Sequence, residues 1–331
     1  MAKRIAINGF GRIGRLTFRK LYNMPDVEIV GINDLTDPAT LAHLLKHDSA
    51  QGAFEKAVRV EGNELIVEDE RIKISAIKSP AELWQGLNVD TVLECTGLFT
   101  DRVKASAHVR PDGAKRVIIS APAKGSDVPT IVLGVNEDSI DPAETIFSNA
   151  SCTTNCLAPM VKIMMDNFGI KFGTMMTIHA YTADQNLQDA PHRDLRRARS
   201  AAVNIVPTST GAGSALRLVI PEIGKKLSAT SYRVPVITGS IVDLNLVLEK
   251  SATVESINAA FLDASINRMK GIVQYSTDPL VSSDIVRNPY SCIFDSLLTE
   301  INGDLVKVVA WYDNEAGYSS RLAELAYKIT N

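Results

Sequence analysis

The sequence predicts an α/β protein of two domains, in which a doubly wound α/β domain precedes an α+β domain with a mainly antiparallel sheet. Three observations predict this. The chain has 331 residues, about twice the usual length of one domain. Its first half alternates short β-branched runs with helical patterns. Its second half has longer strand-like runs, in which apolar and polar residues alternate.

A βαβ unit is expected at the start of the chain, with a strand at residues 4–8, a helix at 12–23 and a second strand at 27–32. Continuous apolar runs are typical of parallel strands that are buried on both faces of a sheet. Such runs continue the same predicted sheet at residues 91–95, 116–120, 130–135 and 145–147. The first domain is therefore predicted to comprise residues 1–151.

The second domain is predicted to comprise residues 152–316. Alternating strands at 242–248 and 305–311 favour a sheet with one face covered by helices. No glycine- or serine-rich linker separates the two halves, so firmly packed domains are expected. A final helical pattern at 317–329 could belong to either domain.

Composition excludes several classes of protein. The chain is 45% hydrophobic and 22% charged, as in ordinary globular proteins, and its net charge of −3 does not favour nucleic acid as a main partner. No signal-peptide core and no apolar run of about 18 residues is visible, so a cytoplasmic protein without membrane spans is expected. Four scattered cysteines suit neither a disulfide scaffold nor a zinc site, and no metal is expected.

The first chemical motif is a glycine-rich turn between the first strand and the first helix. Glycine permits a tight turn and close backbone approach to a pyrophosphate, and the helix start supplies N–H groups. The strand–turn–helix context favours a dinucleotide site of Rossmann type over a plain glycine turn. The residues assigned to it are Gly9, Phe10, Gly11, Arg12, Ile13 and Gly14.

Asp34 follows the second predicted strand, twenty residues after Gly14. A carboxylate at this place can accept hydrogen bonds from the adenosine ribose hydroxyls and can repel a 2′-phosphate. A helix-capping aspartate is the alternative interpretation. NAD is therefore the expected cofactor, in preference to NADP.

The second motif is SNASCTTNC at residues 148–156, between an apolar strand and an apolar helical pattern. A cysteine at a helix N-terminus lies at the positive end of the helix dipole, which lowers the thiol pKa and favours the thiolate. This position nominates Cys152 as a nucleophile. Cys156 lies one turn further from the unpaired N–H groups and is expected to be packed and inert.

His179 lies in the strand-like segment TIHAYT at residues 177–182. An imidazole within hydrogen-bond reach of Cys152 would stabilise the thiolate as an ion pair and act as general base and acid. A structural role is the alternative, as for any lone histidine on a strand. The other histidines, which have no comparable setting, are His43, His47, His108 and His192.

Four segments together resemble the phosphorylating glyceraldehyde-3-phosphate dehydrogenases of bacterial type. They are NGFGRIGR at 8–15, SNASCTTNCLAP at 148–159, DLRRAR at 194–199 and WYDNE at 311–315. The resemblance extends from end to end. It implies that glyceraldehyde 3-phosphate, NAD and inorganic phosphate give 1,3-bisphosphoglycerate and NADH through a thioester on Cys152, in glycolysis. A homotetramer is also implied.

The resemblance assigns further roles by position. Cys152 would be the nucleophile and His179 its partner base. Two anion pockets are implied: one for the substrate phosphate, with Thr182 and Arg233, and one for the attacking phosphate, with Ser151, Thr153, Thr210, Gly211 and nearby Arg197. Taken alone, Arg233 would be a surface charge and Thr210-Gly211 a helix cap. Helix 317–331 would return to the NAD-binding domain, whose cofactor-side residues include Lys78 and Ser120, while Asn314 would hold the nicotinamide carboxamide.

Several positions depart from the common family pattern. Lys78 stands where an arginine is expected, Gln51 where a histidine is frequent, and Ser214 where a lysine is common. Ala190-Pro191 is intermediate between the Leu-Pro of many NAD-specific members and the Ala-Ser of NADP-using photosynthetic members. Because Asp34 remains, a preference for NAD without exclusivity is expected.

Two alternatives remain open from the sequence. The first is erythrose-4-phosphate dehydrogenase, which shares much of the cysteine motif and would release its product with water. The second is a nucleotide-binding interaction protein with a vestigial site. The nucleophile, the base and both sets of anion-binding residues argue against the second alternative.

Overall fold

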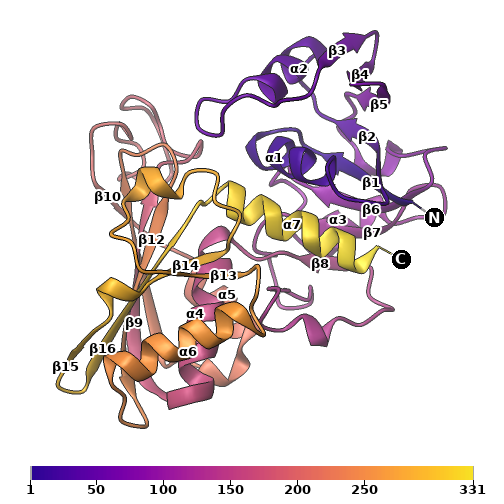
Figure 1. The fold of residues 1–331 in the computed structure, drawn as a ribbon. Coiled ribbons are helices and arrows are strands. Elements are labelled where there is room, and N and C mark those ends of the chain that lie inside the picture. Colours follow the sequence, from indigo (N-terminus) through magenta and orange to yellow (C-terminus); the bar gives the residue numbers. More distant parts are fainter. Residues whose placement is uncertain (1, 331) are drawn as a thin grey trace. The chain divides into compact units, whose positions relative to one another are not determined.

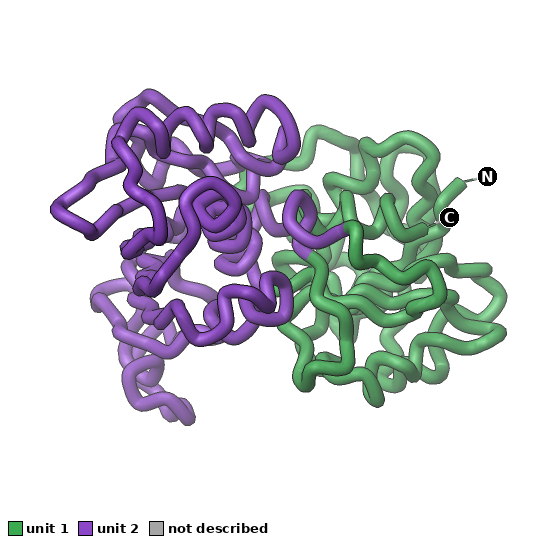
Figure 2. The backbone as a smooth tube through the Cα atoms, turned by 90° about the horizontal axis from the view of Figure 1, so that it is seen from below, with its two compact units in different colours: residues 1–131, 138–150, 319–331 green, residues 132–137, 151–318 purple. Residues whose placement is uncertain are grey.

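The computed structural model describes residues 2–330, which form two compact units (Figure 2). Unit 1 comprises residues 1–131, 138–150 and 319–331, and unit 2 comprises residues 132–137 and 151–318. The sequence predicted a first domain that continues without interruption to residue 151. In the structure the short segment 132–137 groups with unit 2, and the chain from Ser319 onward groups with unit 1.

Unit 1 contains, within the described residues, an eight-stranded sheet in the order β3-β4-β5-β2-β1-β6-β7-β8. Strands β5, β2, β1, β6, β7 and β8 are parallel neighbours, as expected for a doubly wound domain. Every residue of β6 is buried, as a central parallel strand requires. The strands are β1 (Lys3–Asn8), β2 (Val27–Asn33), β3 (Val58–Glu61), β4 (Glu64–Val67), β5 (Glu70–Ser75), β6 (Val89–Glu94), β7 (Ala114–Ile119) and β8 (Ile146–Ser148).

Two parts of this sheet differ from the sequence-based expectation. Residues 58–75 form the antiparallel strands β3, β4 and β5, which were not predicted. The strand predicted at 130–135 is wrong: Thr130 makes one bridge to Ser148, and the chain then turns. Ile131 and Val132 are fully buried there, and a short apolar run does not distinguish a strand from a buried loop.

The helices of unit 1 have local signals in the sequence. Helix α2 (Pro38–Lys46) begins where the Asp37 side chain accepts a hydrogen bond from Thr40 N–H and proline occupies the first helical position. Helix α1 (Arg12–Leu21) ends two residues before the predicted boundary, and α3 (Arg102–Ala105) is one turn long. Figure 1 shows α1 beside the strands of this sheet.

A buried polar network lies at the end of β1 and β6. The Glu94 carboxylate accepts hydrogen bonds from Asn8 Nδ2 at 2.6 Å and from Thr96 N at 2.9 Å, and it contacts His108 Nε2 at 3.0 Å. Trp84 Nε1 donates to His108 Nδ1 at 3.0 Å. Because an indole N–H only donates, Nδ1 accepts, and Nε2 carries the proton and donates to Glu94. In each of these contacts the Glu94 carboxylate therefore accepts a hydrogen bond and its partner donates it.

Unit 2 contains, in the described part of the chain, a mixed sheet in the order β10-β11-β9-β12-β16-β14-β13, with β15 paired to β16. Most neighbours are antiparallel, but β9 with β11 and β13 with β14 are parallel. Burial alternates along β12, as its sequence pattern predicted. The strands are β9 (Ile170–Ala180), β10 (Val206–Thr208), β11 (Leu227–Val234), β12 (Ser240–Leu248), β13 (Val273–Ser276), β14 (Cys292–Asp295), β15 (Glu300–Asn302) and β16 (Leu305–Tyr312).

Helix α4 (Cys152–Phe168) forms the centre of the helical layer of unit 2. It packs against α5 (Ala212–Val219), α6 (Val254–Ile266) and the strands β9, β12, β14 and β16 (Figure 1). Met160 and Met164 of α4 are fully buried, as are Leu244 and Leu246 of β12. The last helix, α7 (Ala316–Ile329), begins in unit 2. The predicted fold class is confirmed: a doubly wound α/β unit is followed by an α+β unit.

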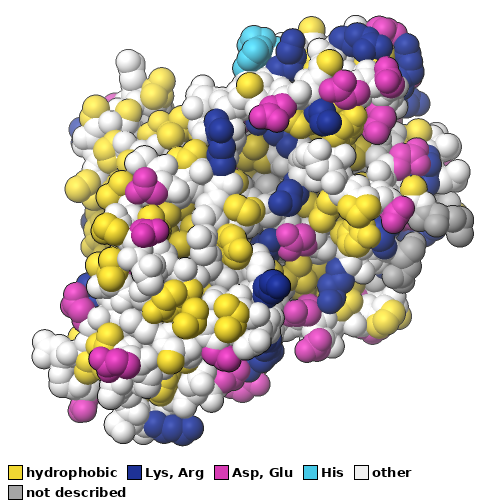
Figure 3. Space-filling view, in the orientation of Figure 1, with side chains coloured by type: hydrophobic (Ala, Val, Ile, Leu, Met, Phe, Trp, Pro, Cys, Tyr) yellow, Lys and Arg dark blue, Asp and Glu magenta, His cyan; other side chains and the backbone are white. Residues whose placement is uncertain are grey.

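The surface shows no field of one sign on the face drawn in Figure 3, where basic and acidic side chains are interspersed. Within residues 2–330, no helix has both the length and the apolar character that a membrane span requires.

Candidate active site

The glycine turn of unit 1 joins β1 to α1 in a conformation that needs glycine at two positions. Gly9 has φ +92°, and a Cβ on it would lie 2.7 Å from Thr96 N. A Cβ on Gly14 would lie 2.1 Å from Gly9 O. The backbone therefore closes tightly on itself at both places, as expected for a dinucleotide-binding turn.

Gly11 is different, because the protein itself does not need glycine there. A Cβ on Gly11 would meet nothing within 4 Å, and this residue caps α1 without a side-chain hydrogen bond. The first turn of α1 also has no acidic residue. An open, uncapped helix N-terminus of this kind fits a pyrophosphate, and the residues present therefore fit NAD.

Asp34 directly follows β2 and holds the glycine turn. Its Oδ2 accepts a hydrogen bond from Phe10 N at 2.7 Å, and its Oδ1 accepts one from Thr36 N at 2.9 Å. The Phe10 ring is buried against Phe18. Phe10 therefore contributes its backbone, rather than its ring, to this turn.

The remaining predicted cofactor residues of unit 1 have weaker structural support. Arg12 Nη1 pairs with Asp48 at 2.6 Å, so its charge is already compensated. Ile13 is partly buried on the first turn of α1, and Lys78 is exposed. Ser120 follows β7, and its N–H donates to Glu94 O at 2.9 Å.

Cys152 is the first residue of α4, as the sequence predicted. Ser151 is the N-cap: its hydroxyl accepts a hydrogen bond from Thr154 N at 3.1 Å. Ala150, immediately before, has φ +57°. The side chain of Cys152 is partly buried, whereas Cys156 is fully buried, so only Cys152 of this pair is accessible.

His179 lies on β9 and meets Cys152 inside unit 2. Its Nε2 is 3.4 Å from Cys152 Sγ. Its Nδ1 is 2.7 Å from Ala180 O and 3.1 Å from Arg233 Nη1. Because the carbonyl only accepts and its contact is shorter, we assign the proton to Nδ1. Nε2 is then free to accept the proton of the Cys152 thiol.

The electrostatics of this pair differ from the sequence-based expectation. Burial raises the pKa of the Cys152 thiol, although the Arg233 charge and hydrogen bonds from Thr153 act in the opposite direction. Burial, and next the Arg233 charge, lower the pKa of His179 to about 3. The predicted lowering of the Cys152 pKa is therefore wrong for this thiol titrated alone, because desolvation outweighs the helix terminus. His179 is neutral near pH 7 and suited to act as a base.

Tyr312, which the sequence analysis did not select, fixes the geometry of the pair. Its hydroxyl bridges Thr153 Oγ1 on α4 and Thr177 Oγ1 on β9, at 2.9 Å from each. Its ring packs edge-on against His179. Burial raises the pKa of Tyr312 well above its usual range, so the hydroxyl stays protonated and can donate. Its place at the end of an alternating strand, in the WYDNE run, was the available signal.

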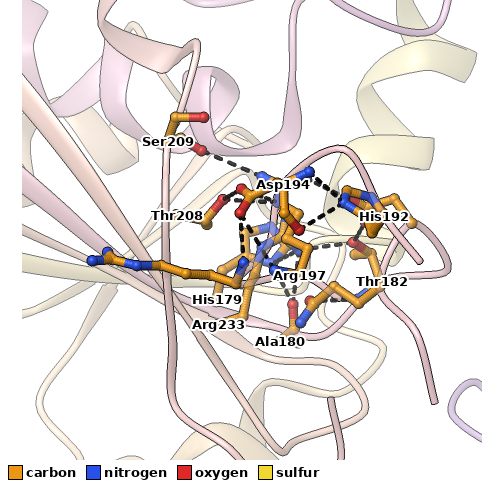
Figure 4. Close-up of polar contacts among 12 residues, drawn as sticks. His179, Ala180, Thr182, His192, Asp194, Arg197, Thr208, Ser209 and Arg233 are labelled. Carbon is orange, nitrogen blue, oxygen red and sulfur yellow. Dashed lines mark hydrogen bonds and ion pairs between the residues drawn. The ribbon is translucent and has the colours of Figure 1, made fainter. Parts of the chain in front are cut away.

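The residues predicted to bind the substrate phosphate lie together beside His179 (Figure 4). Arg233 Nη1 donates to Thr182 Oγ1 at 2.8 Å and to Ala180 O at 3.0 Å. Asp184 contacts both Thr182 and Arg197, and so joins Arg197 to this group. Asp194 also pairs with Arg197, so the group is a compact cluster in which two guanidinium groups lie with the carboxylates of Asp184 and Asp194. Its guanidinium groups suit recognition of a phosphate.

The second predicted anion set is less clearly assembled. The Ser151 hydroxyl caps α4, and the Thr153 hydroxyl contacts Tyr312, so both are engaged within the protein. Thr210 Oγ1 accepts a hydrogen bond from Ala212 N at 3.2 Å, and Gly211 caps α5. Arg197 donates to Thr208 Oγ1 at 2.7 Å (Figure 4). The local geometry thus agrees with the helix-cap interpretation of Thr210-Gly211, which does not exclude anion binding at the same helix end.

Comparisons with known proteins identify the family. The family model described as "Glyceraldehyde 3-phosphate dehydrogenase, NAD binding domain" matches residues 3–102, and the model of the C-terminal domain matches residues 151–314. A glyceraldehyde-3-phosphate dehydrogenase of Mycobacterium tuberculosis is 56% identical, and one of Mycolicibacterium smegmatis is 54% identical, each over 98% of both chains. Glyceraldehyde-3-phosphate dehydrogenase 1 of Streptomyces avermitilis is 54% identical over the same shares.

The chain belongs to the glyceraldehyde-3-phosphate dehydrogenase family. This confirms the predicted resemblance, and it makes the chain an NAD-dependent oxidoreductase. The names of the relatives favour the glyceraldehyde-3-phosphate dehydrogenase interpretation over the erythrose-4-phosphate alternative.

Proposed function

We propose that this chain oxidises glyceraldehyde 3-phosphate with NAD and inorganic phosphate to 1,3-bisphosphoglycerate and NADH, through a thioester on Cys152. Family membership supports the substrate, the phosphate and the cofactor. The observation that carries the assignment of residues is the 3.4 Å contact between Cys152 Sγ and His179 Nε2 at the start of α4. A nucleophile and a base within hydrogen-bond reach are what covalent catalysis requires.

In the first half of the reaction, Cys152 Sγ attacks the aldehyde carbon and the thiol proton moves to His179 Nε2. The aldehyde oxygen then carries negative charge, which His179 Nε2–H and the backbone N–H groups at the start of α4 stabilise. Arg233 and Thr182 hold the substrate phosphate beside His179. NAD, when bound, supplies the hydride acceptor that turns this adduct into the thioester.

In the second half, inorganic phosphate attacks the thioester carbon and Cys152 Sγ leaves. The imidazolium of His179 stabilises the departing thiolate and returns the proton to it. Arg197, with Thr210 and Gly211, is proposed to hold the attacking phosphate, together with Ser151 and Thr153 at the start of α4. On the cofactor side, Asn314 is proposed to hold the nicotinamide carboxamide, and Asp34 the adenosine ribose.

The experiment is NADH formation from glyceraldehyde 3-phosphate, followed by absorbance with phosphate present and then withheld. With phosphate we expect sustained turnover. Without phosphate we expect a burst of about one NADH for each active site, because the thioester stays on Cys152. Sustained turnover without phosphate would instead indicate release by water, and no NADH at all would indicate a vestigial site. Erythrose 4-phosphate serves as the competing substrate.

We also propose a homotetramer that acts in the cytoplasm. The segment of unit 2 between β9 and β10 exposes large apolar side chains, namely Leu187, Leu195, Val203 and Ile205, each at least 69% exposed. Apolar side chains gathered on one segment mark an interface. Light scattering of the wild type and of Leu195→Asp would test this, since a charged residue in an interface should weaken the assembly.

A further inference from the structure

The side-chain amide of Asn314 has hydrogen bonds to its oxygen, Oδ1, but none from its nitrogen, Nδ2, among the described residues. The residue lies between β16 and α7 and is 5% exposed. Its Oδ1 lies 3.0 Å from Ser240 Oγ and 3.3 Å from Thr238 Oγ1. Its Nδ2 makes no hydrogen bond with any described residue. Nδ2 is not among the fully buried side-chain atoms that lack a partner, so it is accessible from outside, and its N–H groups are available to a ligand acceptor.

The hydrogen bonds of Ser240 determine whether the oxygen or the nitrogen of the Asn314 amide faces its hydroxyl. Its hydroxyl accepts a hydrogen bond from Ala180 N at 3.1 Å, so the proton of the hydroxyl is available for donation. Asn314 Oδ1 is the acceptor within reach of that proton among the described residues. If the amide were turned over, its N–H would face Ser240 and the hydroxyl proton would lose its acceptor. The hydrogen-bond count therefore fixes the orientation of the amide.

Thr238 cannot replace Ser240 in this role. Its single hydroxyl proton has a nearer acceptor in Asp313 Oδ1, at 2.8 Å, than in Asn314 Oδ1. A carboxylate is also the stronger acceptor of the two. The proton of Thr238 is therefore committed to Asp313, and Ser240 is the dedicated donor to Asn314.

Ser240 is also connected to His179, the proposed catalytic base, through the backbone of Ala180. Ala180 donates its N–H to Ser240, and its carbonyl oxygen is the contact of His179 Nδ1 at 2.7 Å. One residue thus holds the imidazole through its C=O and the serine through its N–H. Ser240 is 1% exposed and begins β12, whose next residue, Ile241, pairs with Ile178 of β9. Ser240 therefore links the position of Asn314 to β9, the strand that carries His179.

We propose that Ser240 is a positioning residue for the nicotinamide of NAD: by holding Asn314 Oδ1, it turns the amide N–H groups toward the carboxamide oxygen of the cofactor. This inference rests on the proposed role of Asn314. The ligand chemistry is that of a primary carboxamide, whose oxygen accepts from Asn314 Nδ2. Loss of the serine hydroxyl leaves the amide free to turn over and present its oxygen instead.

The test compares the dissociation constants of NAD and of ADP-ribose, which lacks the nicotinamide ring, by calorimetry. Ser240→Ala should weaken NAD about tenfold, the cost of about one hydrogen bond, and leave ADP-ribose unchanged. Ser240→Thr, which keeps a hydroxyl, should lie nearer the wild type. Unchanged binding of ADP-ribose also shows that the variant is folded.

Two controls separate the inference from the proposed function. Ser296→Ala removes another buried serine of unit 2, whose hydroxyl donates to Ser276 O, and should change neither constant. Asn314→Ala should weaken NAD alone. If Asn314→Ala is selective but Ser240→Ala weakens both ligands equally, or neither, the inference about Ser240 is wrong. If Asn314→Ala is not selective, the proposed role of Asn314 is wrong, and the inference falls with it.

Discussion

Replacing His179 with asparagine should reduce both the reactivity of Cys152 and the turnover, and turnover should fall further. Sγ and Nε2 are 3.4 Å apart. A thiolate and an imidazolium at that separation attract each other by about 5 kcal/mol at an effective dielectric constant of about 20. Burial opposes each charge formed alone, because it raises the pKa of Cys152 and lowers that of His179 to about 3. The mutual attraction is therefore the interaction that allows the thiol proton to move to Nε2.

Without the imidazole, the thiolate forms against the full burial penalty, and the midpoint of alkylation by iodoacetamide should move to higher pH. Loss of even a third of this attraction would lower the fraction of Cys152 present as thiolate at pH 7 about tenfold. The alkylation rate at that pH should therefore fall by at least that factor. Turnover should fall by about 10²–10⁴-fold, since general-base and general-acid assistance are lost as well. The assay is alkylation from pH 5 to 10, mapped to residues by mass spectrometry, beside NADH formation.

Cys156 provides an internal reference, because burial raises its pKa well above the usual range and its side chain is inaccessible. His43→Asn is the matched control: the His43 side chain is exposed on α2 and its ring contacts that of His47, neither of which belongs to the proposed site, so the change should alter neither measurement. An alkylation midpoint that is the same in His179→Asn and in the wild type would refute the pairing. Catalysis would then need another base.

Three further changes test other parts of the structure. Asp34→Ala should raise kcat/KM with NADP and lower it with NAD, since the variant loses a charge that repels the 2′-phosphate and a contact to Phe10 N; equal use of both cofactors by the unmodified enzyme would contradict this. Arg233→Leu should raise KM for the phosphorylated aldehyde by about 10–100-fold and affect a non-phosphorylated aldehyde much less, whereas equal losses would indicate a structural role. Glu144→Gln should cost about 1–3 kcal/mol in urea denaturation at pH 7, because it breaks the pair with Arg102. That pair lowers the pKa of Glu144, so its stabilisation is complete above the unfolded pKa of about 4.3 and is lost as pH falls through the folded pKa; a difference that persisted at pH 2 would argue against this origin.

The parts of the site that the sequence predicted well depend on local signals. Ser151 caps a helix that starts at Cys152, and both features can be recognised from neighbouring residues alone. Gly9 and Gly14 precede and enter α1, and Asp34 follows β2, so the spacing of a βαβ unit sufficed. Local patterns of this kind are largely independent of how the rest of the chain packs.

The parts that the sequence could not predict depend on contacts between distant segments. Tyr312 contacts Thr153, 159 residues earlier, and no spacing rule predicts such a pair. The direction of the pKa shift of Cys152 depends on burial of the thiol in the folded protein, which a helix-terminus argument does not contain. The strand predicted at 130–135 was wrong for a related reason. A segment that is buried without pairing to a strand has the same apolar sequence pattern as a buried strand.

The network around Glu94 limits how this part of the sequence can change during evolution or design. Its hydrogen bonds have a direction, since Trp84 donates to His108 and His108 donates to Glu94. Glutamine has almost the same shape as glutamate, yet Glu94→Gln would set an amide N–H either against Asn8 and His108, which both donate to Oε2, or against Thr96 N, which donates to Oε1. Phenylalanine at position 84 would leave His108 Nδ1 without its donor. A single substitution in this network therefore leaves a buried polar group unpaired even where it looks conservative. A different network at this place requires several substitutions together.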